Sequence, residues 1–112
     1  MASGKLGTAS LAVSTWTSVY TVPANKVATV NIRMVNSDMI NPVSVRLALS
    51  MIIGAAANSD YIVPKDFVLP AGGIMEESAL VMSPGEIVNA FASNNQVAVR
   101  VHGFETPILP TV

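Results

Sequence analysis

Few side chains in this sequence could act together in catalysis. The 112 residues include one histidine, His102, and no cysteine. A hydrolytic zinc site takes three protein ligands and keeps one position open, so His102 would need two carboxylates beside it, which the spacing of the acidic residues does not suggest. Glu76 and Glu77 are neighbours in an expected strand, where adjacent side chains point to opposite faces. We therefore expect no catalytic, metal-binding or cofactor-binding residues, and a protein that is not an enzyme.

Three arginines have the spacing to form a binding surface. Arg33, Arg46 and Arg100 occupy outward positions of alternating stretches. If their strands are neighbours, the guanidinium groups form a stripe that can bind carboxylates of another subunit. The alternative is a solvated face, where isolated ion pairs contribute little. A nucleic-acid partner is not expected, because six Lys and Arg against seven Asp and Glu give a net charge of −1 and no clustered basic face.

Trp16 is the single tryptophan, and it lies near the start of an expected strand. Its ring could stack on the apolar face of a sugar, so a carbohydrate-binding module that recognises a host surface glycan is the alternative function. Packing in the core or at an interface is favoured, because one Trp, two Tyr and three Phe are few for a lectin or for a surface that stacks nucleic-acid bases.

The composition indicates one small domain with unusually little charge. A chain of 112 residues buries roughly 60–70% of the surface of its unfolded form, which is enough for a core without disulfides. Charged residues make up 12% and apolar residues 51%, whereas an average soluble domain has about 25% and about 45–50%. Some of the surface is therefore expected to face other protein.

We expect neither a membrane span nor an export signal in this sequence. The longest apolar run, at residues 47–57, is interrupted and falls short of the roughly 20 residues of a membrane helix. The N-terminus lacks an apolar segment behind a basic start, so we expect no signal peptide. We expect synthesis in a cytoplasm, which the lack of cysteine permits, and no membrane partner.

Three proline-containing turns divide the sequence into strands. They lie at residues 22–26, 69–73 and 83–86, where Pro presets φ and the following Asn or Gly tolerates positive φ. Alternating apolar and polar residues follow each turn, as in half-buried strands. The sequence therefore predicts an all-β fold: a single antiparallel β-sandwich of seven or eight short strands, jelly-roll or immunoglobulin-like.

Two stretches, residues 28–34 and 43–49, alternate so regularly that we expect them to pair as antiparallel neighbours. Residues 51–60 are rich in Ala and Gly, and the sequence leaves open whether they form a helical turn or a crossing loop. Pro64 cannot donate to a ladder, which indicates an edge strand or a break. The residues in the inward phase of their strands form the expected core: Val30, Ile32, Val45, Leu47, Leu80, Val99 and Val101.

We expect a single domain over residues 1–112 with an arm at each end. The final residues 108–112 are apolar but too rich in proline for the centre of a sheet. Residues 1–11 and 106–112 are expected to lie against neighbouring subunits. The predicted partner interface comprises these residues: Arg33, Arg46, Arg100, Trp16, Ile108 and Leu109.

The order of the motifs resembles small β-sandwich virion proteins of tailed bacteriophages, over residues 19–105. A strand end that runs into a Pro-Ala turn comes first, and an alternating strand with an arginine follows it. The resemblance rests on these segments, in this order: Val19-Tyr20-Thr21-Val22-Pro23-Ala24-Asn25-Lys26, Val43-Ser44-Val45-Arg46-Leu47-Ala48, Tyr61-Ile62-Val63, Leu69-Pro70-Ala71-Gly72-Gly73, Glu76, residues 80–85, and Val101-His102-Gly103-Phe104-Glu105.

This resemblance implies a non-enzymatic structural subunit of the virion. It would be a capsid decoration or cement subunit, or an accessory subunit of the tail, neck or baseplate. The implied partners are other copies of itself and a larger virion protein, such as the major capsid protein or a tail or baseplate protein. The implied location is the virion, after synthesis in the host cytoplasm. Low charge suits a subunit that buries contacts with many neighbours.

Overall fold

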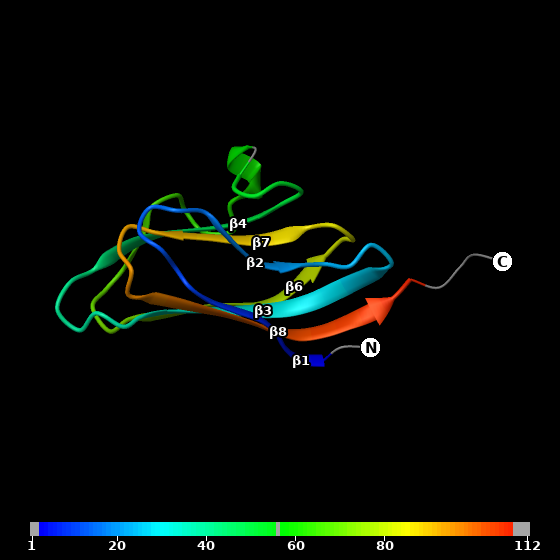
Figure 1. Cartoon of the computed structure of the whole chain (residues 1–112), viewed down its shortest axis with the longest axis horizontal. Helices are drawn as coiled ribbons and strands as arrows, with labels where there is room; N and C mark the ends of the chain where they lie inside the picture. Colours follow the sequence, from blue (N-terminus) through cyan, green and yellow to red (C-terminus); the bar gives the residue numbers. More distant parts are fainter. Residues whose placement is uncertain (1–2, 56, 109–112) are drawn as a thin grey trace.

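The computed structural model describes residues 3–55 and 57–108, which form two antiparallel four-stranded sheets packed face to face (Figure 1). The predicted all-β sandwich is confirmed. No helix among these residues is long and apolar enough to cross a membrane. The elements are β1 Ser3–Ser10, β2 Thr17–Thr21, β3 Lys26–Asn36, β4 Val43–Ser50, the 3-10 turn η1 Asn58–Asp60, β5 Phe67–Leu69, β6 Ile74–Met82, β7 Ile87–Ala92 and β8 Val97–Pro107.

The strand order identifies this sandwich as a jelly roll. Sheet A has the order β1-β8-β3-β6, and sheet B has the order β2-β7-β4-β5. The first strand pairs with the last, the second with the seventh, the third with the sixth and the fourth with the fifth. One long antiparallel hairpin is thus rolled into two layers, which are completed by the β3–β8 and β4–β7 pairs. An immunoglobulin-like sandwich has a different order of strands.

The predicted pairing of residues 28–34 with residues 43–49 is wrong. These residues belong to β3 and β4, which lie in different sheets. Alternation shows that a strand has one buried face, but it does not show which strand lies beside it. Here each strand buries its apolar face against the opposite sheet, so the two patterns look alike without being hydrogen-bonded neighbours.

The predicted N-terminal arm is also wrong. Residues 3–10 form β1, an edge strand of sheet A that pairs with β8, and Leu11 is buried in the core. Small residues in β1 obscured its alternation, and one of them has a structural reason: a Cβ at Gly7 would overlap the carbonyl oxygen of Val19 in β2. At the other end, Pro107 closes β8 and the Ile108 backbone N–H donates to the Asn25 carbonyl.

The core lies between the sheets and contains the inward side chains of both. Six of the seven predicted core residues are buried, and Leu80, on the edge strand β6, is half-buried against the core. A buried polar contact also joins the two sheets. Tyr20 in β2 donates a hydrogen bond of 2.6 Å to Glu105 in β8, and Lys26 lies 3.5 Å from the same carboxylate. Burial, together with this carboxylate, raises the pKa of Tyr20.

The connection between β4 and β5 folds over the outer side of sheet B, where it stands above the strands in Figure 1. The region left open by the sequence, residues 51–60, is mostly loop and ends in the 3-10 turn η1. Ile62 then returns along β4, because its N–H donates to the Leu47 carbonyl. Of the two alternatives predicted from Pro64, an edge strand or a break, the structure shows a break at this residue, which lies in the connection before the edge strand β5.

Candidate functional site

The structure separates the three predicted interface arginines. Arg33 in β3 and Arg100 in β8 lie directly opposite each other in sheet A, whereas Arg46 in β4 belongs to sheet B. The expected stripe of three therefore does not form. Two arginines share one outer face of the sandwich, and the third lies on the other.

Arg46 already has partners within its own chain. Its Nε donates to Asp66 Oδ1 at 2.7 Å, its Nη2 reaches Oδ2 at 3.5 Å, and its guanidinium lies 4.3 Å from the centre of the Phe91 ring. The hydrogen bond from Arg46 holds the pKa of Asp66 below its usual range. Because the charge of Arg46 is paired with Asp66 and its planar face lies over Phe91, this side chain has few groups free to bind another protein.

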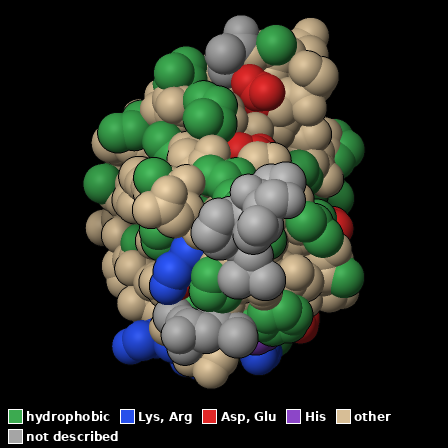
Figure 2. All heavy atoms as spheres, turned by 90° about the vertical axis from the view of Figure 1, so that its right-hand side faces the viewer, with side chains coloured by type: hydrophobic (Ala, Val, Ile, Leu, Met, Phe, Trp, Pro, Cys, Tyr) green, Lys and Arg blue, Asp and Glu red, His purple; other side chains and the backbone are tan. Residues whose placement is uncertain are grey.

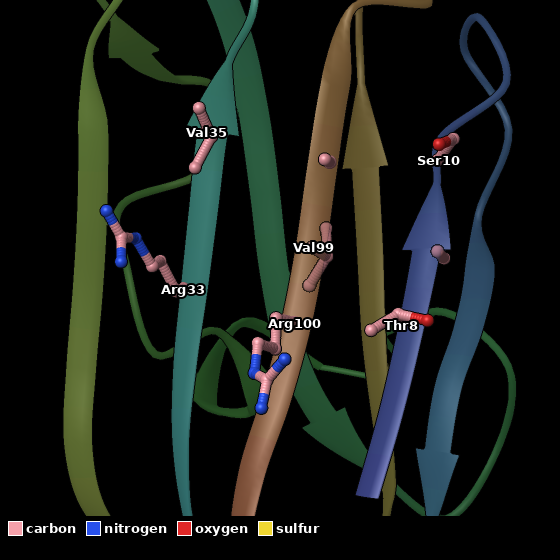
Figure 3. A pocket seen from close by; sticks show the side chains of 8 residues that line it. Thr8, Ser10, Arg33, Val35, Val99 and Arg100 are labelled. Atoms are coloured by element: carbon pink, nitrogen blue, oxygen red, sulfur yellow. The ribbon is translucent and has the colours of Figure 1, made fainter. Parts of the chain in front are cut away.

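Arg33 and Arg100 make no ion pair or side-chain hydrogen bond within residues 3–55 and 57–108, and both are exposed. They border a shallow hollow of about 480 Å³ on the outer face of sheet A (Figure 3). In this view the Arg33 side chain turns toward β6, while that of Arg100 stays over β8. The hollow is lined by Thr8, Ala9, Ser10, Arg33, Val35, Ala98, Val99 and Arg100.

Charge is distributed unevenly over the sandwich. One row of opposed residues crosses sheet A in the order Thr8, Arg100, Arg33 and Glu76, and Lys5 lies in the same sheet opposite His102. Figure 2, seen from the end that carries the termini, shows the visible Lys and Arg side chains in the lower half of the view, on the side of sheet A. The outer face of sheet A is therefore a cationic surface with an acidic edge at β6.

A second exposed feature lies at the end of the sandwich opposite the termini (Figure 1). Met39 and Ile40, in the loop between β3 and β4, are 77% and 85% exposed, and we call this pair the apolar tip. The loop around them is held firmly: the Asp38 carboxylate accepts hydrogen bonds from the backbone N–H groups of Ile40 and Asn41. These hydrogen bonds lower the pKa of Asp38.

Asn36 fastens this loop to the neighbouring turn between β5 and β6. Its side chain is fully buried, and its Nδ2 donates to the carbonyls of Asn41, Leu69 and Pro70. Its Oδ1 accepts the Asp38 N–H at 3.1 Å. The apolar tip is not among the residues predicted from the sequence, although two large apolar residues between the polar turn residues Asp38 and Asn41 are a recognisable signal.

Trp16 packs against the chain's own aromatic residues. Its ring lies 5.5 Å from Phe91 and 6.2 Å from Tyr61, centre to centre, and Gly54 approaches it from the β4–β5 connection. The side chain is half-buried on the outer side of sheet B. These contacts make Trp16 part of the packing that holds the connection in place, and they leave less of its ring for a sugar.

The remaining predicted site residues lie at the C-terminal end. Ile108 is about half exposed beyond β8, and Leu109 lies outside the described residues. Within the described part of the chain, no three His, Cys, Asp or Glu side chains are grouped as a metal site. Comparison of the chain with protein-family models, curated proteins and solved structures found no match.

Proposed function

We propose that this chain is a non-enzymatic structural subunit of a bacteriophage virion. It would serve as a capsid decoration or cement subunit, or as an accessory subunit of the tail, neck or baseplate. The observation that carries the proposal is the apolar tip, where Met39 and Ile40 project into solvent from a loop whose backbone is held by Asp38 and Asn36.

The tip has the properties of a preformed protein contact. Large apolar side chains that project from a fixed loop lose little conformational freedom on binding, so more of the burial energy appears as affinity. Full burial of one such side chain contributes about 1.5–3 kcal/mol. The tip carries no Lys or Arg, so its chemistry fits an apolar pocket of a larger virion protein.

The architecture gives weaker support, by analogy alone. Eight-stranded jelly rolls recur in viral capsid domains, and also in lectins and other proteins. The unpaired arginines of sheet A add a second exposed surface, so a repeated subunit would have two separate places at which to contact neighbours.

The test counts copies of this chain in purified particles of the phage whose genome encodes it, by quantitative mass spectrometry. We expect a fixed ratio to the major capsid or tail protein, and at least a tenfold loss of bound copies for the double variant M39S/I40S, which corresponds to about 1.4 kcal/mol. The matched control is I53S, since Ile53 is 64% exposed but lies in the β4–β5 connection.

Absence of the chain from purified particles would contradict the proposal. Specific binding of the purified protein to a host surface glycan, lost on Trp16→Ala, would instead establish the carbohydrate-binding alternative. The contacts of Trp16 with Phe91 and Tyr61 give that alternative no support at present.

A further inference from the structure

The outer face of sheet A combines charge with exposed apolar side chains. On one side of the row of Arg100, Arg33 and Glu76, the next outward row contains Ile74. On the other side, Val81 and Phe104 lie in the second outward row, beyond Asn31 and His102. Ile74 is 55% exposed, Val81 74% and Phe104 46%. A flat face of this kind has the composition of a contact surface rather than of a purely solvated one.

We propose that two copies of this chain pair through the outer faces of sheet A, around a two-fold axis, with Glu76 of each copy bound to Arg100 of the other. The inference deepens the proposed function, on which it rests, by naming one partner of the assembling subunit. A closed two-fold pair buries the same patch of both copies, so the patch must complement itself.

The charge pattern selects the alignment of the two faces. Consider a two-fold axis that runs parallel to the strands. With the axis between β8 and β3, Arg33 would lie over Arg100 of the second copy, and the like charges would repel. With the axis along β3, β6 lies over β8 of the second copy, so that Glu76 meets Arg100 twice, once in each direction. This alignment also brings the two Arg33 residues together at the axis, one like-charge contact instead of the two in the first alignment. The Arg33 side chain turns toward β6 in Figure 3, away from this axis.

The area is sufficient for a specific contact. Strands about 4.8 Å apart, with about nine residues at about 3.3 Å each, give three overlapping strands a flat area of about 430 Å² per copy. Side chains that stand out from the sheet add accessible area to this figure. The flat area for two copies is about 860 Å², so the side chains need to add about 140 Å² to reach the roughly 1,000 Å² of a biological interface.

The experiment measures the mass of the purified full chain in solution by analytical ultracentrifugation over the micromolar range. We expect a dimer for the wild type, and a dissociation constant at least about tenfold higher for either R100E or E76R, a loss of about 1.4 kcal/mol. The double variant E76R/R100E exchanges the two charges and should restore the dimer. The control K65E makes the same change of charge at an exposed residue outside sheet A and should leave the dimer intact.

A wild-type chain that stays monomeric throughout this range overturns the proposal, and so does a dimer that R100E and K65E weaken equally. Thermal melting of every variant checks that the fold is kept. Arg100 is exposed and makes no side-chain hydrogen bond or ion pair within the described residues, so R100E tests the interface even if E76R melts early. If the wild-type chain is monomeric in solution but its number of copies in purified particles is as expected, only the proposed dimer is contradicted. The proposed function then stands, because the particle test depends on the apolar tip.

Discussion

Arginine side chains have different surroundings on the two outer faces of the sandwich. On sheet B, Arg46 is held by Asp66 and Phe91, and the β4–β5 connection lies over part of the face. On sheet A, Arg33 and Arg100 face solvent without an acidic partner within the described residues. All three occupy outward positions of alternating strands, so the difference comes from what the chain places above them. The chain covers part of the outer face of sheet B itself, and it leaves open the face of sheet A on which we propose the contact with a second copy.

Topology explains why only one face is covered. The long connection between β4 and β5 belongs to sheet B and brings both Asp66 and Tyr61 back over β4. Sheet A has β8 and β3 in its middle, and the connections that precede these two strands and the one that follows β3 lie at the ends of the sandwich (Figure 1). No described connection of comparable length returns across sheet A.

The largest effect on stability should come from a substitution in the core, because the core supports both sheets. Leu47 is fully buried between the sheets, and Leu47→Ala should lower the free energy of unfolding by about 2–5 kcal/mol. Chemical denaturation monitored by circular dichroism measures the loss. Leu80→Ala is the matched control, because Leu80 is only half-buried and should cost less than about 2 kcal/mol. Wild-type stability in the Leu47 variant would contradict the assignment of the core.

A smaller loss of stability should distinguish sheet B, which the β4–β5 connection covers, from sheet A. Asn89, fully buried in sheet B, donates to Ser50 Oγ and to the Ile52 carbonyl, both at 3.0 Å. Asn89→Ala removes both hydrogen bonds, although the Ile52 carbonyl keeps the one from the Ser50 hydroxyl, and should cost about 1–3 kcal/mol. Faster hydrogen exchange should be confined to the β4–β5 connection and its neighbours, as mass spectrometry of peptides can show.

The control for this prediction lies on sheet A. Asn31→Ala removes one hydrogen bond, from the Ala79 N–H at 2.9 Å, and should cost only about 0.5–1.5 kcal/mol. If the two asparagine variants lost equal stability and exchanged the same peptides, the β4–β5 connection would not be a separate structural cover.

The sequence predicted the class of fold and most of the core because these depend on local alternation. Val30 and Ile32, or Val45 and Leu47, report their inward phase through nearest neighbours alone. The partners of each strand depend on residues far apart in the chain, such as Ser3 opposite Phe104, and no local pattern encodes them. β1 was not predicted because its small residues show no clear alternation of apolar and polar side chains. Gly7 allows β1 to approach β2 closely instead of filling the core.

The candidate site was predictable only in part, for the same reason. The outward phase of the arginines followed from alternation, and the structure agrees with it. That Arg46 meets Asp66 depends on a fold-back of the chain at twenty residues' distance, which the sequence does not display. The apolar tip depends on buried Asn36, whose hydrogen bonds to three carbonyls hold two loops together. An asparagine at the end of a strand pattern gives no sign of such a role.

The smallest effect concerns the arginines themselves, and double-mutant cycles of unfolding free energy measure it. Alanine changes at Arg46 and Asp66 should be coupled, weakly because the pair is exposed. Changes at Arg33 and Glu76, which are opposed in sheet A without an ion pair, should show no coupling, and Arg33→Ala should alter stability by less than about 0.5 kcal/mol. The second cycle is measured in the R100A background, which removes the proposed contact with a second copy without placing a carboxylate opposite Arg33.

The pH dependence of the first cycle identifies its source. Arg46 lowers the pKa of Asp66 from its ordinary value of 3.8, so the folded state holds the ionised form more tightly than the unfolded state does. The stabilisation is therefore present above the ordinary pKa of an aspartate and is lost as the pH falls through the lowered pKa of Asp66. Coupling between Arg46 and Asp66 should accordingly disappear in acid. A coupling between Arg33 and Glu76 as large as that between Arg46 and Asp66 would mean that Arg33 is paired within its own chain. The contrast between the two faces would then no longer support an assembly surface on sheet A.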